Sequence, residues 1–154
     1  MALKEGDQAP EFSLSASNRQ TVSLKDFTGK KVVVLFYPRD NTSGCTREVC
    51  SLHDCHDDIR EVGATTLGVS GDSLKSHDNF IAKGDLPFLL LSDDDKEMSV
   101  GYGAWGEKKN YGRMYMGMHR ITYLINEHGR VAKAWPKVKP DNHGEEVLAA
   151  IKGG

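Results

Sequence analysis

Three cysteines, Cys45, Cys50 and Cys55, lie within eleven residues of one another. An odd number of cysteines in so short a window does not indicate a secreted disulfide framework. It indicates redox, nucleophilic or metal chemistry. Cys45 follows an apolar run and a loop that begins at Pro38, at the expected first turn of a helix. Helix amides and the helix dipole favour a thiolate there, and a thiolate of low pKa attacks peroxide oxygen to give a sulfenic acid.

A helical projection of residues 45–62 separates the three cysteines. Cys45 falls on the side of the apolar stripe, which consists of Val49, Leu52, His56 and Ile59. Cys50 falls on the opposite side among charged residues, which are Arg47, Asp54, Asp57, Asp58 and Glu61. Cys55 lies on the flank of the apolar stripe. We therefore expect Cys45 to face the core and Cys50 to face solvent.

The spacing of Cys45 and Cys50 is too long for a disulfide in an intact helix. Five residues of ideal helix place the two Cα atoms roughly 8.6 Å apart. A disulfide requires about 4.4–6.8 Å and converging Cβ atoms. If a sulfenic acid at Cys45 condenses with Cys50, the first turns of the helix must unwind. The sequence thus predicts a redox-linked local unfolding.

Other interpretations of these cysteines stay open at this point. A helical cysteine is often a small buried hydrophobe, and this is the better interpretation of Cys55. Cys50, His53, Cys55 and His56 lie close together, but their spacing is not one typical of zinc sites. A thiol–disulfide oxidoreductase would normally carry C-x-x-C at the helix start, and a binding protein without redox activity would keep its thiols in peroxide.

The bulk composition indicates a soluble globular protein. The chain has 154 residues, which is enough for one domain spanning 1–154 with one core. Its composition, with 38% hydrophobic and 27% charged residues, argues against disorder. The net charge of −2 favours neither nucleic acid nor an anionic membrane as a partner. The N-terminus does not resemble a secretory signal, and the longest apolar run is too short to span a bilayer. These features predict a cytoplasmic protein.

Hydrophobic periodicity predicts an α/β fold around this segment. A small N-terminal hairpin is expected from the alternation of Phe12 and Leu14 with Val22 and Leu24, turning at residues 17–20. The runs Val32–Tyr37 and Ala64–Val69 read as strands buried on both faces. Between them the pattern predicts a helix from Thr42 or Ser43 to Glu61, with Gly63 just past its end, so the unit is a right-handed βαβ.

The rest of the chain extends this unit. Asp72 or Ser73 can cap a helix that ends near Gly84, and strand, short helix and hairpin follow at residues 88–91, 96–100, and 121–126 with 130–135. A last helix begins at Asp141 or Asn142 and runs through Ile151. Residues 101–119 are glycine-rich and aromatic and are predicted to be irregular. A βαβ unit, a helix, a hairpin and a closing helix form the thioredoxin-like order, a central mixed sheet flanked by helices, with an N-terminal β-hairpin extension.

The segment FYPRDNTSGCTREVC resembles the active-site segment of peroxiredoxins of the Q or bacterioferritin-comigratory type. The family motif is a proline, three residues, a threonine, two residues and the reactive cysteine. The resemblance covers nearly the whole chain, through GDQAPEFSL, LGVSGDS, LLLSDDD, YGAWGEKK and HRITYLINEHGRV. It implies a peroxidase that reduces hydrogen peroxide and organic hydroperoxides.

The resemblance implies a role for five residues. Cys45 is the peroxidatic nucleophile, Thr42 bonds the thiolate and the peroxide oxygen, and Pro38 shields the sulfur from water. Arg120 stabilises the thiolate and the charge on the leaving oxygen. Cys50 is the resolving cysteine of one branch of the family. Without the resemblance, Arg120 would be read as a surface arginine at a strand end and Thr42 as a helix cap.

The resemblance also implies partners and cofactors. A Cys45–Cys50 disulfide would be recycled by thioredoxin or a similar dithiol protein, in a monomeric enzyme that needs no metal, haem or flavin. Ser43 replaces a proline common in the family, and we expect no loss of function from it. Another family branch carries its resolving cysteine in the next helix, where SHDNFIAKG has none. Cys55 has no assigned role, and Trp105 and Trp135 are expected to be packing residues.

Overall fold

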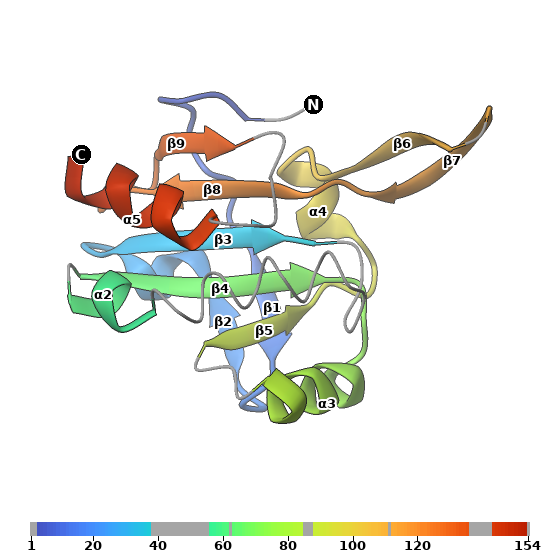
Figure 1. Ribbon diagram of the computed structural model, residues 1–154, viewed down its shortest axis with the longest axis horizontal. Helices are drawn as coiled ribbons and strands as arrows, with labels where there is room; N and C mark the ends of the chain where they lie inside the picture. Colours follow the sequence, from blue (N-terminus) through green and yellow to red (C-terminus); the bar gives the residue numbers. More distant parts are fainter. Residues whose placement is uncertain are drawn as a thin grey trace.

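The computed structural model describes residues 3–37, 56–61, 63–84, 88–110, 112–135 and 143–153. Its main sheet has seven strands in the order β2-β1-β5-β4-β3-β8-β9, and β6 and β7 form a separate two-stranded sheet (Figure 1). The strands are β1 Ser13–Ala16, β2 Thr21–Ser23, β3 Lys31–Phe36, β4 Ala64–Ser70, β5 Leu89–Ser92, β6 Trp105–Asn110, β7 Arg113–Met118, β8 Ile121–Ile125 and β9 Val131–Trp135. The helices are η1 Leu24–Phe27, α2 His56–Glu61, α3 Leu74–Gly84, α4 Glu97–Gly101 and α5 His143–Gly153.

The central strand β3 is buried on both faces, as its apolar run predicts. Val32, Val34 and Phe36 belong to one core cluster, while Val33 and Leu35 belong to the other. This alternation follows from the two-residue period of a strand. β3 pairs in parallel with β4 and antiparallel with β8. The order β3-α2-β4-α3, then β8-β9-α5, confirms the predicted thioredoxin-like arrangement.

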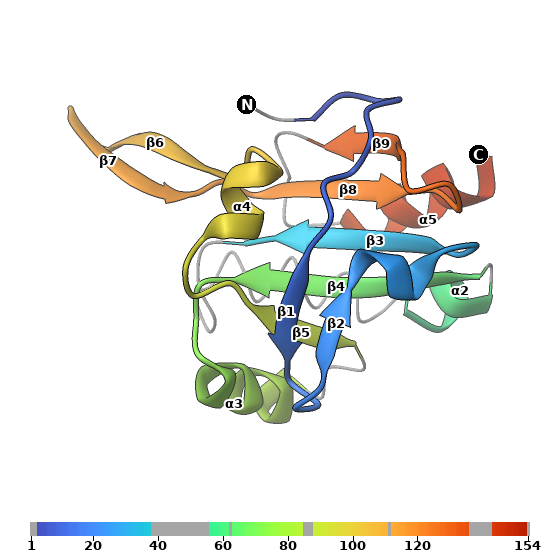
Figure 2. The same ribbon diagram turned by 180° about the vertical axis from the view of Figure 1, so that it is seen from behind.

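Different elements cover the two faces of the sheet. Helices α2 and α5 lie on one face, where Ile59, Val147 and Ile151 join the cluster around Leu35 (Figure 1). The N-terminal segment and α4 lie on the other face, where β1 and β2 cross in front of β4 and β5 as the edge of the twisted sheet (Figure 2). Among the residues that the structure describes, no helix is both long and apolar enough to cross a membrane.

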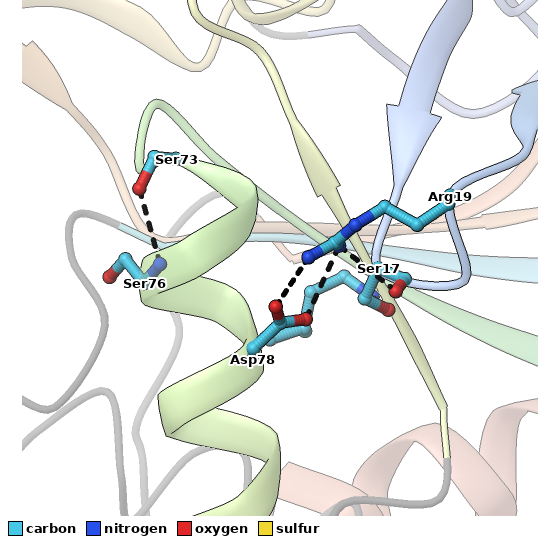
Figure 3. Close-up of polar contacts among 6 residues, drawn as sticks. Ser17, Arg19, Ser73, Ser76 and Asp78 are labelled. Carbon is cyan, nitrogen blue, oxygen red and sulfur yellow. Dashed lines mark hydrogen bonds and ion pairs between the residues drawn. The ribbon is translucent and has the colours of Figure 1, made fainter.

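The predicted N-terminal hairpin is confirmed, and it is built into the main sheet. β1 pairs with β2 through Leu14 and Val22 and also pairs antiparallel with β5. Figure 3 shows how its turn is fixed to α3. Arg19, which has a left-handed φ of 66°, donates to Ser17 O at 3.2 Å and forms an ion pair with Asp78.

The start of α3 follows the predicted capping. The Ser73 hydroxyl accepts a hydrogen bond from the Ser76 amide at 3.1 Å (Figure 3). This bond satisfies one of the free amides of the first helical turn. Of the two predicted caps, Ser73 therefore provides the capping oxygen, and the helix ends at Gly84 as predicted.

The prediction that residues 101–119 are irregular is wrong. Their larger part forms a regular antiparallel hairpin, in which Trp105 pairs with Met118 and Asn110 with Arg113. Gly112 has a φ of +80° beside the turn, a conformation that favours glycine. The hydrophobic periodicity of the sequence did not predict these strands, because it reflects the alternation of buried and exposed side chains. Residues 113–116 are exposed on both faces of the hairpin, so no alternation of apolar and polar residues marks the strands.

An aromatic cluster joins the N-terminal segment, α4, β3 and β8. The Tyr102 ring centroid lies 5.5 Å from that of Phe36 and 5.9 Å from that of Tyr123. The Tyr102 hydroxyl donates to Pro10 O at 2.6 Å, and the Tyr123 hydroxyl donates to Tyr102 O at 2.7 Å. Burial raises the pKa of both tyrosines, so both stay neutral donors at physiological pH.

Candidate functional site

We call residues 38–55, which contain Pro38, Thr42 and the three cysteines, the cysteine segment. The structure describes the residues that surround this segment. Pro38, Thr42, Cys45 and Cys50 all lie outside the described residues, as does Cys55. The expected distance between the first two cysteines and the start of their helix are therefore untested predictions. The structure describes Arg120, together with the strand ends from which the chain enters and leaves this region.

Strand register places Arg120 at the point where the cysteine segment begins. β3 and β8 run antiparallel, and Phe36 is paired with Ile121. Arg120 precedes Ile121 in the same way that Tyr37 follows Phe36, so the two lie at neighbouring positions on this end of the sheet. The Tyr37 amide donates to Val69 O at 3.1 Å, which carries the sheet up to residue 37. Arg120 is half-buried and therefore partly screened from water.

The same end of the sheet carries a polar network that is partly buried. The Ser70 hydroxyl donates to the Asp72 carboxylate at 2.8 Å, and the Ser92 hydroxyl donates to Asp72 O at 2.7 Å. The fully buried Asp93 carboxylate accepts the Met98 and Ser99 amides at 3.3 and 2.7 Å. These residues come from the LGVSGDS and LLLSDDD motifs. Their contacts join the ends of β4 and β5 to the start of α4.

Lys96, directly before α4, contacts Trp105 at the start of β6. It adopts a left-handed φ of 63°, and its ammonium lies 5.3 Å from the centroid of the Trp105 ring. A cation over an indole face is stabilising. Trp105 is half-buried and packs against the core cluster that contains Phe36 and Met118. Trp135 packs against the other cluster. Both tryptophans are therefore packing residues, as predicted.

The last turn of α2 agrees with the helical projection. Ile59 is fully buried, while Asp58 and Glu61 are exposed. The apolar and charged sides of the projection are thus correct for this turn. The faces of Cys45 and Cys50 lie outside the described residues and stay predictions. Among the described residues, no three His, Cys, Asp or Glu side chains gather at a distance suited to one metal ion. The metal interpretation rests on residues around Cys50 and is untested.

Gly68 is a supporting residue that the sequence analysis did not identify. An added Cβ would lie 2.5 Å from Cδ2 of Leu90 and 3.3 Å from Cε1 of Tyr37. Both neighbours are fully buried, and the Tyr37 ring packs against Phe80 at 6.1 Å. The absence of a side chain at Gly68 thus makes room for the residue that directly precedes Pro38. A glycine inside an otherwise apolar strand was the available signal.

We expect Gly68→Ala to destabilise the protein by about 2 kcal/mol, because its methyl group overpacks a fully buried site. Urea unfolding followed by tryptophan fluorescence measures the change in the free energy of unfolding. Gly101→Ala is the matched control, since its added Cβ meets only Pro10 at 3.8 Å, an ordinary contact. Equal unfolding midpoints for the two variants would contradict the role of Gly68.

Known proteins are similar in sequence to this chain over nearly their full lengths. Residues 5–134 match the AhpC/TSA family. Peroxiredoxin Bcp of Bacillus subtilis (strain 168) is 43% identical over 152 residues, covering 99% of this chain and 97% of that protein. Peroxiredoxin Bcp of Escherichia coli (strain K12) is 41% identical over 150 residues, covering 97% of this chain and 96% of that protein.

Solved structures of proteins of the same type are similar in fold to this chain. A mutant of Xylella fastidiosa PrxQ superimposes with a TM-score of 0.93 at 35% identity, covering 99% of this chain and 98% of that chain. The bacterioferritin comigratory protein of Xanthomonas campestris, studied for its alkyl peroxide reduction activity, has a TM-score of 0.88 at 39% identity. That match covers 92% of this chain and 90% of the other.

Proposed function

Since this chain belongs to the AhpC/TSA family and is a peroxiredoxin of the Bcp and PrxQ type, a thiol-dependent peroxidase, we propose that Cys45 is its nucleophile. The Cys45 thiolate attacks one peroxide oxygen, and the O–O bond breaks as the S–O bond forms. The leaving oxygen takes a proton and departs as water or an alcohol. Cys45 is left as a sulfenic acid.

Three further residues complete the proposed peroxide site. Arg120 stabilises the thiolate and the negative charge that develops on the leaving oxygen. Thr42 donates a hydrogen bond to the sulfur or the peroxide, and Pro38 keeps water from the sulfur. The observation that carries this proposal is the pairing of Phe36 with Ile121, which sets Arg120 beside the start of the cysteine segment.

We propose that Cys50 resolves the sulfenic acid. Its sulfur attacks the Cys45 sulfur, water leaves, and an intramolecular disulfide forms. A dithiol protein such as thioredoxin then reduces this disulfide and becomes oxidised itself. Hydrogen peroxide and organic hydroperoxides are the proposed substrates. The alkyl peroxide reduction activity studied in the Xanthomonas campestris relative supports the second class.

We also propose that residues 1–154 act as one domain in a monomeric cytoplasmic enzyme. The seven-stranded sheet supports the single domain, because it combines β1 and β2 near the N-terminus with β8 and β9 near the C-terminus. Size-exclusion chromatography with light scattering measures the oligomeric state, and cell fractionation measures the location.

One equivalent of hydrogen peroxide, added to reduced, metal-free protein, tests the redox cycle. We expect loss of two thiols and of about two mass units per chain, because disulfide formation removes two hydrogen atoms. In Cys50→Ser the sulfenic acid cannot condense, so it should accumulate at Cys45 as a gain of one oxygen atom. Thiol titration and intact mass spectrometry measure both results. Wild-type protein that keeps all three thiols would refute the proposal.

A further inference from the structure

The chain has five methionines, and the structure describes four of them, which are Met98, Met114, Met116 and Met118. Two of these four are buried in the core cluster that contains Phe36, with Met98 5% and Met118 3% exposed. Met114 is 60% exposed and Met116 is 53% exposed, and we call these two the exposed pair. The fold therefore divides four chemically identical thioethers into two that solvent reaches and two that it does not.

The exposed pair lies on the β6–β7 hairpin. Figure 1 shows this hairpin extending away from the main sheet, at the end where β3 and β4 also end. Met114, Met116 and Met118 occupy alternate positions of β7 and therefore share one face. Met118 is paired with Trp105, which packs against the core, whereas Met116 is paired with the exposed Glu107. Distance from the core along one strand thus decides which of the three sulfurs is accessible.

Specific contacts hold the base of the hairpin closed over Met118. The Lys108 ammonium donates to Met118 O at 3.0 Å. His119 Nε2 lies 3.1 Å from Glu107 O, which ties the residue after β7 back to β6. A buried group reaches solvent only when the structure around it opens. Met118 is therefore protected for as long as these contacts hold, while the exposed pair needs no opening.

A hydroperoxide oxidises a thioether without help from another residue. The sulfur attacks one peroxide oxygen, the O–O bond breaks, and the hydroperoxide proton passes to the other oxygen, which leaves as water or an alcohol. The sulfur gains one oxygen atom and loses two electrons, so it becomes a sulfoxide. An uncharged thioether is a weaker nucleophile than a thiolate. Methionine oxidation should therefore follow oxidation of the reactive thiol.

We infer that Met114 and Met116 form a second peroxide-consuming site of this enzyme, at which methionine is oxidised reversibly. Each sulfur consumes one hydroperoxide, and Cys45 takes no part, so the site does not depend on which residue is the nucleophile. Both side chains are exposed, so water solvates the polar sulfoxides and the core is unchanged. A sulfoxide at Met118 would instead bury a polar group. Methionine sulfoxide reductases, one for each sulfoxide epimer, restore the thioethers.

Peptide mapping after treatment with a large excess of hydrogen peroxide tests the inference. Tryptic peptide 114–120 contains the exposed pair and Met118 but no cysteine, and peptide 97–108 contains Met98. We expect the exposed pair to gain one oxygen atom at each sulfur at least about tenfold faster than Met98 or Met118, in line with their exposed fractions. Tandem mass spectrometry locates each oxygen. Met118 is an internal control, because it lies in the same strand, face and peptide.

Three further samples separate accessibility from other causes. Protein unfolded in guanidinium chloride should oxidise all of its methionines at similar rates, because the fold no longer protects any of them. Met114→Leu/Met116→Leu should take up two fewer oxygen atoms and keep Met118 reduced. Cys45→Ser should oxidise the exposed pair as fast as the wild type does. Oxidised wild-type protein, after its disulfide is reduced, should keep its thermal unfolding midpoint and lose both oxygen atoms to methionine sulfoxide reductases.

Each contrary result overturns the inference. Equal rates for Met118 and the exposed pair in folded protein would remove the role of burial. An exposed pair that gains no oxygen in excess peroxide would not be a peroxide-consuming site. Oxidation that disappears in Cys45→Ser would show that the oxygen passes through the thiol, and a lowered unfolding midpoint would show that the sulfoxides damage the fold. Protein that keeps all three thiols yet oxidises the exposed pair would refute the Cys45 chemistry and leave this inference intact.

Discussion

Cys45→Ser is expected to abolish the peroxidase activity. A serine hydroxyl is not ionised at neutral pH and is a far weaker nucleophile than a thiolate, so no sulfenic acid can form. We expect the second-order rate constant with hydrogen peroxide to fall by at least ~10⁴-fold, the scale on which loss of the nucleophile acts in other covalent enzymes. Stopped-flow measurement of peroxide consumption under single-turnover conditions gives this rate constant without involving the reductant.

The same substitution at the other two cysteines provides the controls. Cys50→Ser should keep the first step, because the Cys45 thiolate is intact, and lose steady-state turnover with thioredoxin. Cys55→Ser should keep both, since we assign Cys55 no role. Thermal unfolding of all three variants separates loss of chemistry from loss of folding. If Cys45→Ser retained the wild-type single-turnover rate while Cys55→Ser lost it, the assignment of the nucleophile would be wrong.

Arg120→Ala is expected to lower the rate constant with peroxide by roughly 10²- to 10³-fold. A charged donor directed at the oxygen that gains negative charge stabilises the transition state, and removal of one such donor has this effect in other enzymes. The pKa of the Cys45 thiol should also rise, because a neighbouring cation stabilises the thiolate. Thiolate absorbance near 240 nm, followed against pH, measures this shift separately from turnover.

Arg120→Lys should recover only part of the lost rate. Lysine keeps the positive charge but loses the planar pair of donors that can bond sulfur and peroxide oxygen together. Arg130→Ala is the matched control, since Arg130 is an exposed arginine directly before β9, at the other end of the sheet, and donates to Gly6 O at 3.2 Å. Equal rates for Arg120→Ala and Arg130→Ala would show that Arg120 acts only as a surface arginine.

The sequence predicted the parts of this fold that bury apolar side chains. The continuous apolar runs of β3 and β4, the hydrophobic spacing of α3 and the hairpins at both ends were all identified, because burial leaves a period in the sequence. Ile59 was correctly placed on the buried side of its helix for the same reason. The β6–β7 hairpin was not predicted, because Met114 and Tyr115 are exposed on opposite faces of it and no burial pattern marks its strands.

The chemistry of this protein is determined by local sequence, while its surroundings are determined by the tertiary structure. The positions of Cys45 and Cys50 in the chain are enough to predict a reactive thiol and a second thiol that an intact helix would hold too far away for a disulfide. Arg120, by contrast, is 75 residues further along, and nothing in its neighbours shows what it approaches. Only the pairing of β3 with β8 places it beside the cysteine segment. The room that Gly68 leaves for Tyr37 is likewise visible only in the folded sheet, because contacts between distant strands leave no local signature.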